Sequence, residues 1–451
     1  MTAKDGETAT LACDDLDDEG AATATFEGAR VHVACALPGE RVRATVTHVS
    51  SHRPEAWARL DEIEAPSPDR RAPACPAYGS CGGCVLQHLD VAAQRAWKEA
   101  RVRRALVAHP VLAGVAVAPA VASPKDLGYR NRSKLVASGA RGRLVLGAFA
   151  PRSHAVVDLT GCRIAEPPLD DVATALRAAA DAAGVAPHDE LTRVGDLRHV
   201  VLRANAEGQV HAILVTARAE VTGLDALVDA LRTARPEVVG VVQNVNSSRG
   251  NVIFGHETRA LAGVGTLEDR VGDVKLRLSP GAFFQANRDV AALAYAAIAR
   301  AVDAHPGEAV VDAYGGVGGI ALTLAQASGD RLDVLGIEEH AAATADATAS
   351  AALNGITRAR FVTGDVATCL RDVARADAVV LNPPRKGCDP AVLTEVARLR
   401  PRTIAYLSCD PDTLARDLAA LVERGFAVEG VVPLDMMPHT PHVEALAILR
   451  R

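Results

Sequence analysis

The spacing of apolar residues changes along the chain and predicts a different kind of structure in each part. From about residue 22, short alternating runs are separated by Gly or Pro turns, as in a small β-barrel, and Pro66 and Pro68 end this pattern. Strand-like and helix-like patterns mix from about 110 to 270, which indicates an α+β unit. From about 305, five apolar runs alternate with five helical patterns, so we expect a doubly wound parallel sheet.

These patterns predict a multidomain α/β protein with a Rossmann-like C-terminal part. Two strand patterns in the tail should form a hairpin at the edge of its sheet, and a helix with a basic face is expected over 86–109. The first 30 residues hold eight acids and two bases, which favours disorder at the very start. The expected divisions are a disordered start at 1–20, an OB-like barrel at 21–68, a cysteine segment at 69–95, a central α+β domain at 96–270 and the Rossmann-like domain at 271–451.

Composition narrows the class of protein. The chain has 451 residues with 55 acids and 49 bases, and a net charge of −6 excludes a wholly basic nucleic-acid coat and a highly charged disordered chain. No run approaches the ~18 consecutive apolar residues of a membrane span. The start also lacks the basic and apolar regions of a secretory signal. We therefore expect a cytoplasmic monomer with no membrane partner.

The mild net charge conceals a basic stretch. Between Asp126 and Asp158 there are six bases and no acid. Such a local excess of positive charge predicts a phosphate-binding face, and the alternative is a solvated strand face. The bases are Arg130, Arg132, Lys134, Arg141, Arg143 and Arg152.

Three of the nine cysteines crowd into ten residues and suggest a ligand site. An odd number of cysteines in a reducing compartment argues against a disulfide framework. Cys75, Cys81 and Cys84, the last two separated by a Gly-Gly pair, need a fourth ligand, for which Cys162 is the natural candidate. Spacing alone favours structural zinc, although the glycines would suit an iron–sulfur cubane equally well.

A glycine-rich turn and three acids indicate a nucleotide-type site. Asp312 ends a predicted strand directly before the sequence AYGGVGG, while Glu338 and Asp365 end the next two strands. Ligands bind at the carboxyl ends of such strands, so the three acids favour a binding site over a mere tight turn. The turn lacks GxGxxG, and the nearby acids suit a cationic amine and sulfonium. This favours S-adenosylmethionine over NAD or ATP.

Residues at the next strand ends carry candidate chemistry. Asn382 and Arg385 frame a paired-proline turn, where Asn can read an amide-like base edge and Arg can hold a phosphate or carbonyl. The alternative is a proline-rich loop with a solvated arginine. Cys409 stands between a strand and a helix whose N-terminus can lower a thiol pKa. Glu444 could act as general base, and Cys388 is a rival nucleophile.

These groups fit methylation at C5 of a pyrimidine. Uracil C5 is a weak nucleophile, and addition of a thiolate at C6 makes it an enolate carbon that can take a methyl group. A base must then remove the C5 proton so that the thiol is eliminated. Cysteine, methyl donor and carboxylate form the minimum set for this reaction.

The C-terminal half resembles the RNA uracil-5-methyltransferase family. The matching segments are FFQAN at 283–287, DAYGGVGG, LNPPRKG, YLSCDPDTLARD and PHTPHVEAL. The resemblance implies that Cys409 is the nucleophile and Glu444 the base. It also implies a cofactor and substrate pocket at Gln285, Tyr314, Gly319, Glu338, Asp365 and Asn382. Many members have Cys where Gly315 stands and Asn where Gly319 stands, which puts the contribution of the turn's side chains in question.

Other segments resemble the ribosomal-RNA branch of this family. CPAYGSCGGCVLQH is similar to its iron–sulfur segment, which implies a [4Fe–4S] cluster in place of zinc. Residues 127–135 resemble its RNA-binding stretch, and the barrel resembles a TRAM domain. The resemblance implies methylation of 23S rRNA. The alternatives are a tRNA uracil-5-methyltransferase, an amino-group methyltransferase that would not need Cys409 or Glu444, and a non-catalytic iron–sulfur RNA-binding factor.

Overall fold

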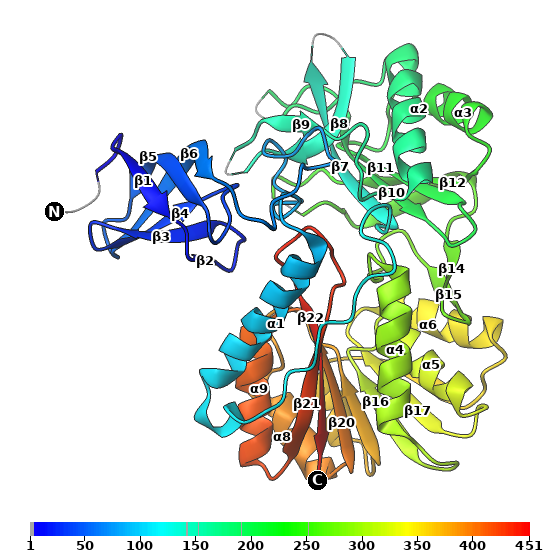
Figure 1. Cartoon of the computed structure of the whole chain (residues 1–451). Helices are drawn as coiled ribbons and strands as arrows, with labels where there is room; N and C mark the ends of the chain where they lie inside the picture. Colours follow the sequence, from blue (N-terminus) through cyan, green and yellow to red (C-terminus); the bar gives the residue numbers. More distant parts are fainter. Residues whose placement is uncertain (1–3, 141–142, 152, 191, 251) are drawn as a thin grey trace.

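The computed structural model describes residues 4–140, 143–151, 153–190, 192–250 and 252–451. These residues form an N-terminal β domain, a central domain with a mixed sheet, and a C-terminal domain in which helices cover both faces of a sheet (Figure 1). In this described part of the chain, no helix is long and apolar enough to span a membrane.

The N-terminal domain is a strongly paired antiparallel sheet with one parallel pair, β4 with β6. Its apolar side chains alternate along the strands, as on β5, where Val42, Ala44 and Val46 are buried between exposed or half-buried residues. The domain is consistent with the predicted OB-like barrel. In the order β1-β5-β6-β4-β3-β2, its strands are Thr8–Ala12, Arg41–Val49, Glu55–Ala65, Ala29–Val33, Ala22–Phe26 and Asp15–Leu16.

The start of the chain differs from the disorder expected over 1–20. Residues 1–3 lie outside the described residues, but β1 pairs with β5, and Leu11 and Leu16 are buried in the barrel core. The acids there have basic partners on helix α1 (Val91–Val107), as between Asp18 and Arg101, whose charged atoms are 2.7 Å apart. Acid-rich composition therefore did not produce disorder, because a distant helix supplies the opposite charge.

The central domain packs helices α2 and α3 on one face of its mixed sheet. Its sheet order is β13-β12-β11-β10-β7-β8-β9, with bounds Glu257–Gly263, Val238–Val245, Val210–Thr216, Leu197–Ala204, Arg132–Ala140, Arg143–Phe149 and Val156–Asp158. The helices are Pro167–Ala183 and Leu224–Ala234. This confirms the predicted α+β character.

The boundary between the central and C-terminal domains differs from the expected one at 96 and 270. Val102 and Leu106 of α1 are buried in the C-terminal core, and the chain after the short helix η1 (Pro110–Leu112) runs beside the sheet edge. There the Ala118 amide donates to the Val431 carbonyl at 2.9 Å. The hairpin of β14 (Leu267–Val271) and β15 (Val274–Leu278) packs into the apolar cluster on the other face of the C-terminal sheet. Both domain boundaries differ from the predicted ones because apolar residues of these segments pack against residues far away in the sequence.

The C-terminal sheet has the order β18-β17-β16-β19-β20-β22-β21. Its strands are parallel except β22, which is antiparallel to both neighbours and forms the predicted edge hairpin with β21. In sheet order the strands are Ala359–Thr363, Asp333–Glu338, Ala309–Ala313, Ala378–Leu381, Thr403–Ser408, Glu444–Arg450 and Ala427–Leu434. The doubly wound prediction is confirmed.

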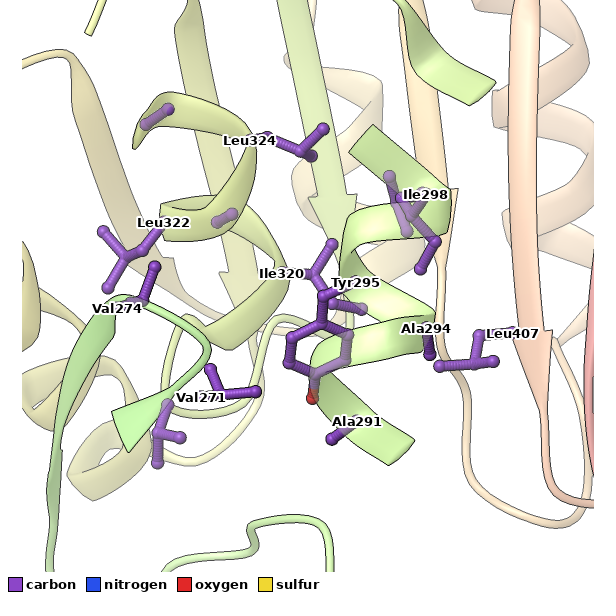
Figure 2. Packing of buried hydrophobic residues seen from close by; sticks show 14 of the residues in the cluster. Val271, Val274, Ala291, Ala294, Tyr295, Ile298, Ile320, Leu322, Leu324 and Leu407 are labelled. Carbon is purple, nitrogen blue, oxygen red and sulfur yellow. The ribbon is translucent and has the colours of Figure 1, made fainter. Parts of the chain in front are cut away.

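Helices cover both faces of this sheet, as alternating buried strand residues require. Figure 2 shows part of the packing on one face, where α4 and α5 meet the β14–β15 hairpin. On this face lie α4 (Arg288–Val302), α5 (Gly319–Ala327) and α6 (Ala341–Leu353). On the other face, with α1, lie α7 (Val366–Arg371), α8 (Pro390–Leu399) and α9 (Pro411–Glu423).

Candidate active site

Cys409 and Glu444 lie at the same edge of the C-terminal sheet. β20 ends at Ser408, one residue before Cys409, and β22 begins at Glu444. The two strands are antiparallel neighbours whose register pairs Ser408 with Ala445. The backbone therefore places the thiol and the carboxyl close together at the carboxyl end of β20, where ligands bind in sheets of this kind.

Glu444 occupies a site that favours its neutral form. The residue is only 4% exposed, and burial raises the pKa of its carboxyl to about 7. A carboxyl with this pKa is partly ionised near neutral pH and still binds a proton well. That combination suits a general base.

The thiol of Cys409 is protonated at neutral pH in the free protein. Burial raises its pKa to about 11, and the nearby Glu444 carboxyl adds to the rise, whereas Arg385 lowers it. The pKa was expected to be lowered by the N-terminus of α9, and the structure differs. Asp410 caps that helix and accepts hydrogen bonds from its first backbone amides, so they are not directed at the thiol.

Arg385 connects two loops beside Cys409. It follows the Asn-Pro-Pro turn beyond β19, and its Nη2 donates to His442 Nδ1 at 3.1 Å. Its carbonyl oxygen accepts from the Thr413 hydroxyl at 3.1 Å. Burial and the Arg385 cation lower the pKa of His442, which keeps this imidazole a neutral acceptor. Arg385 thus brings a positive charge to the thiol from a fixed position.

Cys388, the rival nucleophile, is part of a buried hydrogen-bond network. It is 3% exposed, and its amide donates to Asp417 Oδ2 at 2.7 Å. The same oxygen accepts from the Tyr406 hydroxyl at 2.6 Å. Burial raises the pKa of the Cys388 thiol to about 12. A buried, protonated thiol surrounded by satisfied partners fits a structural role.

Tyr314 links this network to the glycine-rich turn. Its backbone has φ 66°, in the left-handed region, so its side chain leaves the turn in an unusual direction. Burial, together with a hydrogen bond to Cys388, raises the pKa of its hydroxyl. The predicted cofactor residue therefore lies at the turn, with its hydroxyl directed to Cys388.

The glycine-rich turn between β16 and α5 leaves space for a ligand, and a carboxylate oxygen beside it lacks a hydrogen-bond donor among the described residues. Gly316 and Gly318 have φ 54° and 86°, which glycine adopts without strain. Asp312 is fully buried beside them, and its Oδ2 accepts from the Ala321 amide at 3.0 Å. Its Oδ1 has no hydrogen-bond partner within the described residues. A buried orphan acceptor fits a ligand that carries a donor, such as the amine of S-adenosylmethionine.

The other predicted pocket residues lie on neighbouring strand ends. Glu338 ends β17, and its carboxylate accepts from the amides of Gly316 at 3.0 Å and His340 at 2.9 Å. Asp365 caps α7, and the hydrogen bonds it accepts there lower its pKa. Asn382 directly follows β19 and is half-buried. The sheet thus gathers these residues at the edge that also holds Cys409.

Gln285 reaches this edge from the segment before α4. It is 8% exposed, and its carbonyl oxygen accepts from Asn131 Nδ2 at 2.9 Å. The backbone N–H of Asn131 in turn donates to the backbone carbonyl of Ala286 at 2.9 Å. These bonds attach the predicted RNA-binding stretch directly to the predicted pocket.

Tyr295, a residue that the sequence did not indicate, fills the space beside Gly319. A Cβ at Gly319 would lie 2.9 Å from Tyr295 Cε2 and 3.4 Å from its hydroxyl oxygen. Figure 2 shows the ring between α4 and side chains of α5 and the β14–β15 hairpin. Burial, and then the carboxyls of Asp312 and Glu444, raise the pKa of its hydroxyl. No local motif reveals this contact, because the two residues lie on different helices.

The predicted RNA-binding residues lie at the seam between the central and C-terminal domains. Arg130 and Arg132 are half-buried and Lys134 is exposed at the start of β7. Two other bases of the predicted basic face, Arg141 and Arg152, lie outside the described residues. Contact of the first three with RNA stays a prediction.

The four candidate ligand cysteines come within electrostatic range of one another. Burial raises the pKa of Cys84 to about 12, and the thiols of Cys162, Cys81 and Cys75 add to the rise. In the described ranges, no group of three or more His, Cys, Asp or Glu side chains is arranged as a metal-ion site. The cluster assignment stays a prediction.

The loop that leads from β21 into Glu444 is held by residues far earlier in the chain. Lys98 Nζ donates to Asp435 Oδ1 at 2.6 Å, and both side chains are fully buried. Gln94 Oε1 accepts from the His439 amide at 2.8 Å. Helix α1 is therefore part of the support for the candidate base.

Comparison with known proteins identifies the family. A profile of the tRNA (Uracil-5-)-methyltransferase family matches residues 264–451. An uncharacterized RNA methyltransferase of Geobacter sulfurreducens is 40% identical over 99% of this chain and 91% of its own length. The chain belongs to the RNA uracil-5-methyltransferase family. An uncharacterized RNA methyltransferase of Halalkalibacterium halodurans is similar to this methyltransferase at 36% identity, over 97% of this chain and 95% of its own length.

A solved structure matches the methyltransferase over its length. The tRNA (uracil-54, C5)-methyltransferase of Pyrococcus abyssi, in complex with S-adenosyl-L-homocysteine, has a TM-score of 0.78 at 26% sequence identity. The match covers 98% of this chain and 100% of that chain. The predicted family, fold class and RNA methyltransferase activity are confirmed, and the roles of individual residues remain predictions.

Proposed function

We propose that this methyltransferase transfers a methyl group from S-adenosylmethionine to C5 of a uridine in 23S rRNA. The observation that carries the proposal is the meeting of Cys409 and Glu444 at one sheet edge, beside the glycine-rich turn. Asp312, Glu338 and Asp365 would contact the methyl donor. The S-adenosyl-L-homocysteine bound by the Pyrococcus abyssi enzyme supports this choice of donor.

The reaction begins at Cys409. Its thiolate adds to C6 of uracil, and the electrons of the C5–C6 double bond move to C5 and O4 as an enolate. When bound, S-adenosylmethionine would supply the methyl group that C5 takes and would leave as S-adenosylhomocysteine. Because the free thiol has a pKa of about 11, it must lose its proton to solvent as the addition proceeds, and the Arg385 cation favours the resulting thiolate.

Glu444 completes the reaction. Its ionised carboxylate accepts the C5 proton, the electrons of the C5–H bond restore the C5–C6 double bond, and the C6–S bond breaks to release Cys409 as thiolate. A pKa of about 7 leaves the carboxyl partly ionised near neutral pH. Asn382 and Arg385, at the end of β19, would hold the polar edge of the base.

We also propose a [4Fe–4S] cluster held by Cys75, Cys81, Cys84 and Cys162. The resemblance of residues 75–88 to the iron–sulfur segment of the ribosomal-RNA branch supports it, and the thiols of Cys162, Cys81 and Cys75 lie near enough to Cys84 to affect its pKa. When bound, the cluster would supply a rigid cross-link between the segment before α1 and the loop after β9. Protein purified without oxygen should be brown with stoichiometric iron; colourless protein containing zinc would contradict the cluster.

RNA containing 5-fluorouridine tests the covalent mechanism, because fluorine at C5 prevents the last elimination. Wild-type protein should form a denaturation-stable adduct with such RNA, and Cys409→Ala should form none. Cys369→Ala, which removes a half-buried cysteine on α7, is the matched control and should behave like wild type. With ordinary RNA, Glu444→Gln should accumulate the methylated adduct. Full activity of Cys409→Ala would overturn the mechanism.

The alternative target is tRNA. The named activity of the Pyrococcus abyssi relative, whose whole chain is matched, supports it. Mapping 5-methyluridine in rRNA and tRNA from a strain that lacks this gene distinguishes the two. Loss of a 23S rRNA modification supports our proposal, whereas loss from tRNA alone replaces it with the alternative.

A further inference from the structure

Basic side chains face one another across the central sheet. β7 and β10 are antiparallel, and their register places Arg132 directly opposite Arg203. On the other side of β10, the register with β11 places His211 opposite Arg203. The row lies on the face away from α2 and α3, since Leu202, the neighbour of Arg203, belongs to the core under those helices. Arg132 lies in the stretch whose sequence resembles an RNA-binding segment, whereas no motif marks Arg203.

Among the described residues, neither Arg132 nor Arg203 is directly paired with a carboxylate, although the carboxyls of Asp269 and Asp346 act on Arg203 from farther away. Arg203 is 4% exposed, and its Nη2 donates to the Ala282 carbonyl. Its Nη1 and the Nε of Arg132 are buried with no hydrogen-bond partner in the described ranges. Within the same residues, neither guanidinium forms an ion pair. Like charges directly opposite in a sheet are destabilising, and a buried cation without a partner is more so.

A neighbouring arginine shows how the fold treats a structural cation. Arg288 pairs with Glu166 and, at 3.2 Å, with Asp269. Those carboxylates are therefore already engaged. Burial and then the charge of Arg132 lower the pKa of Arg203 to about 9, against an opposing effect of the Asp269 and Asp346 carboxyls. Burial and the charge of Arg130 lower the pKa of Arg132 to about 10. Unlike Arg288, Arg132 and Arg203 are not paired with a carboxylate among the described residues, so an anion could bind between them.

The pair lies on the route to the predicted pocket. Arg203 contacts Ala282, and the Arg132 guanidinium is 6.0 Å from the centre of the Phe283 ring. These residues precede Gln285 in the same segment. Lys134 follows two positions after Arg132 on the same face of β7 and is exposed, so the positive charge continues from the buried pair to the surface.

We propose that Arg132 and Arg203 together bind one phosphate of the RNA backbone at the seam between the central and C-terminal domains. Planar guanidinium groups bind phosphate oxygens through paired hydrogen bonds, and two of them facing each other can share one phosphate. The exposed Lys134 provides the path along which a polyanion enters. The inference rests on the proposed function only in taking RNA as the polymer.

Equilibrium binding of a fluorescein-labelled single-stranded oligouridylate tests the site without requiring the natural target. Arg203→Met and Arg132→Met should each weaken binding on the order of ten-fold at low salt. Each should also reduce the slope of log affinity against log salt, by up to about 0.7, which is the change for one complete phosphate contact on a single strand. Arg300→Met, which removes an exposed cation of α4, is the matched control and should change neither quantity.

Stability separates a ligand site from a structural arginine. Methionine keeps the volume of the side chain and removes an uncompensated charge, so the thermal midpoint of Arg203→Met should equal or exceed that of wild type. Arg203→Lys should restore the salt slope with only part of the affinity. If Arg203→Met does not fold, the half-buried Arg132 gives the same measurement.

Two results would overturn the site. One is oligouridylate binding by both Met variants with the affinity and salt slope of the Arg300→Met control. The other is unchanged RNA binding with weakened binding of S-adenosylhomocysteine, which would assign the anion to the carboxylate of the methyl donor. Failure of wild type to methylate any uridine would remove the proposed function but leave this binding measurement valid.

Discussion

Cys388 and Cys409 lie near the same sheet edge, but their surroundings are built in opposite ways. Around Cys388, an aspartate accepts bonds from an amide and a tyrosine hydroxyl, and the thiol is fully enclosed. Around Cys409, an apolar-buried carboxyl and an exposed arginine shift the thiol pKa in opposite directions. The polar groups around Cys388 bond to one another, as in a structural network. The groups around Cys409 have shifted pKa values and are not bonded to one another in this way, as is common in sites that act on a substrate.

The largest expected effect is on methyl transfer, and it distinguishes a catalytic Cys409 from a structural Cys388. Cys409→Ala should reduce methyl transfer by at least ~10⁴-fold while leaving the free energy of unfolding nearly unchanged. Cys388→Ala should instead lower that free energy by about 1–3 kcal/mol and retain most of the turnover of the folded protein. Transfer of a labelled methyl group to RNA measures the activity, and unfolding in urea measures the free energy of unfolding. A catalytic loss in both variants would remove the distinction.

Glu444 provides the next test, through the pH dependence of stability. Its pKa rises from 4.5 to about 7 on folding. The stability that its protonated form contributes is therefore complete below about pH 4.5 and is lost as the pH rises through about 7. Glu444→Gln cannot ionise, so it should be more stable than wild type by ~3 kcal/mol at about pH 8 and gain nothing at about pH 4.

Urea unfolding of both proteins at several pH values measures this difference. Asp312, whose pKa is also raised to about 7, is present in both proteins, and its contribution cancels. A stability difference that does not change with pH would show that folding does not raise the pKa of Glu444.

A substitution of Asp417 tests whether the hydrogen-bond network around Cys388 is structural. Asp417→Asn keeps the shape of the side chain but replaces an acceptor that serves both the Cys388 amide and the Tyr406 hydroxyl. We expect a loss of about 1–3 kcal/mol in the free energy of unfolding. Adduct formation with 5-fluorouridine RNA should continue at the wild-type rate. Slower adduct formation at full stability would mean that this network acts on the chemistry.

The smallest expected effect concerns Arg385. Because its cation lowers the pKa of Cys409, Arg385→Gln should raise that pKa and slow alkylation of Cys409 by about three- to ten-fold at mildly alkaline pH. Lys386→Gln removes the adjacent exposed cation and is the matched control. Equal rates in both variants would show that Arg385 has no special effect on the thiol.

Sequence pattern predicted what depends on short-range periodicity. The alternation of apolar strands and helices gave the C-terminal sheet, and the edge hairpin followed from two strand patterns in the tail. The acids at the ends of β16 and β17 were found because each directly follows an apolar run. Such features are set by the residues within one element.

Features that depend on distant partners were missed. The bases of α1 predicted a basic helix face, but the pattern did not show that Arg101 pairs with Asp18 from the acid-rich start. The Cys409 pKa was expected to fall, since no local pattern shows the burial that raises it. Tyr295 and Arg203 have no motif, and their importance comes from Gly319 and Arg132, which only the fold brings to them.

The support of the β21–β22 loop by α1 limits how far the catalytic half can be treated as a module. The family profile begins at residue 264, yet Lys98 and Gln94 fix the backbone just ahead of Glu444. A chimera that joins this C-terminal domain to the N-terminal parts of a relative would have to exchange α1 and the loop 435–443 together. These two segments, separated by most of the chain, have to be treated as one unit in protein engineering.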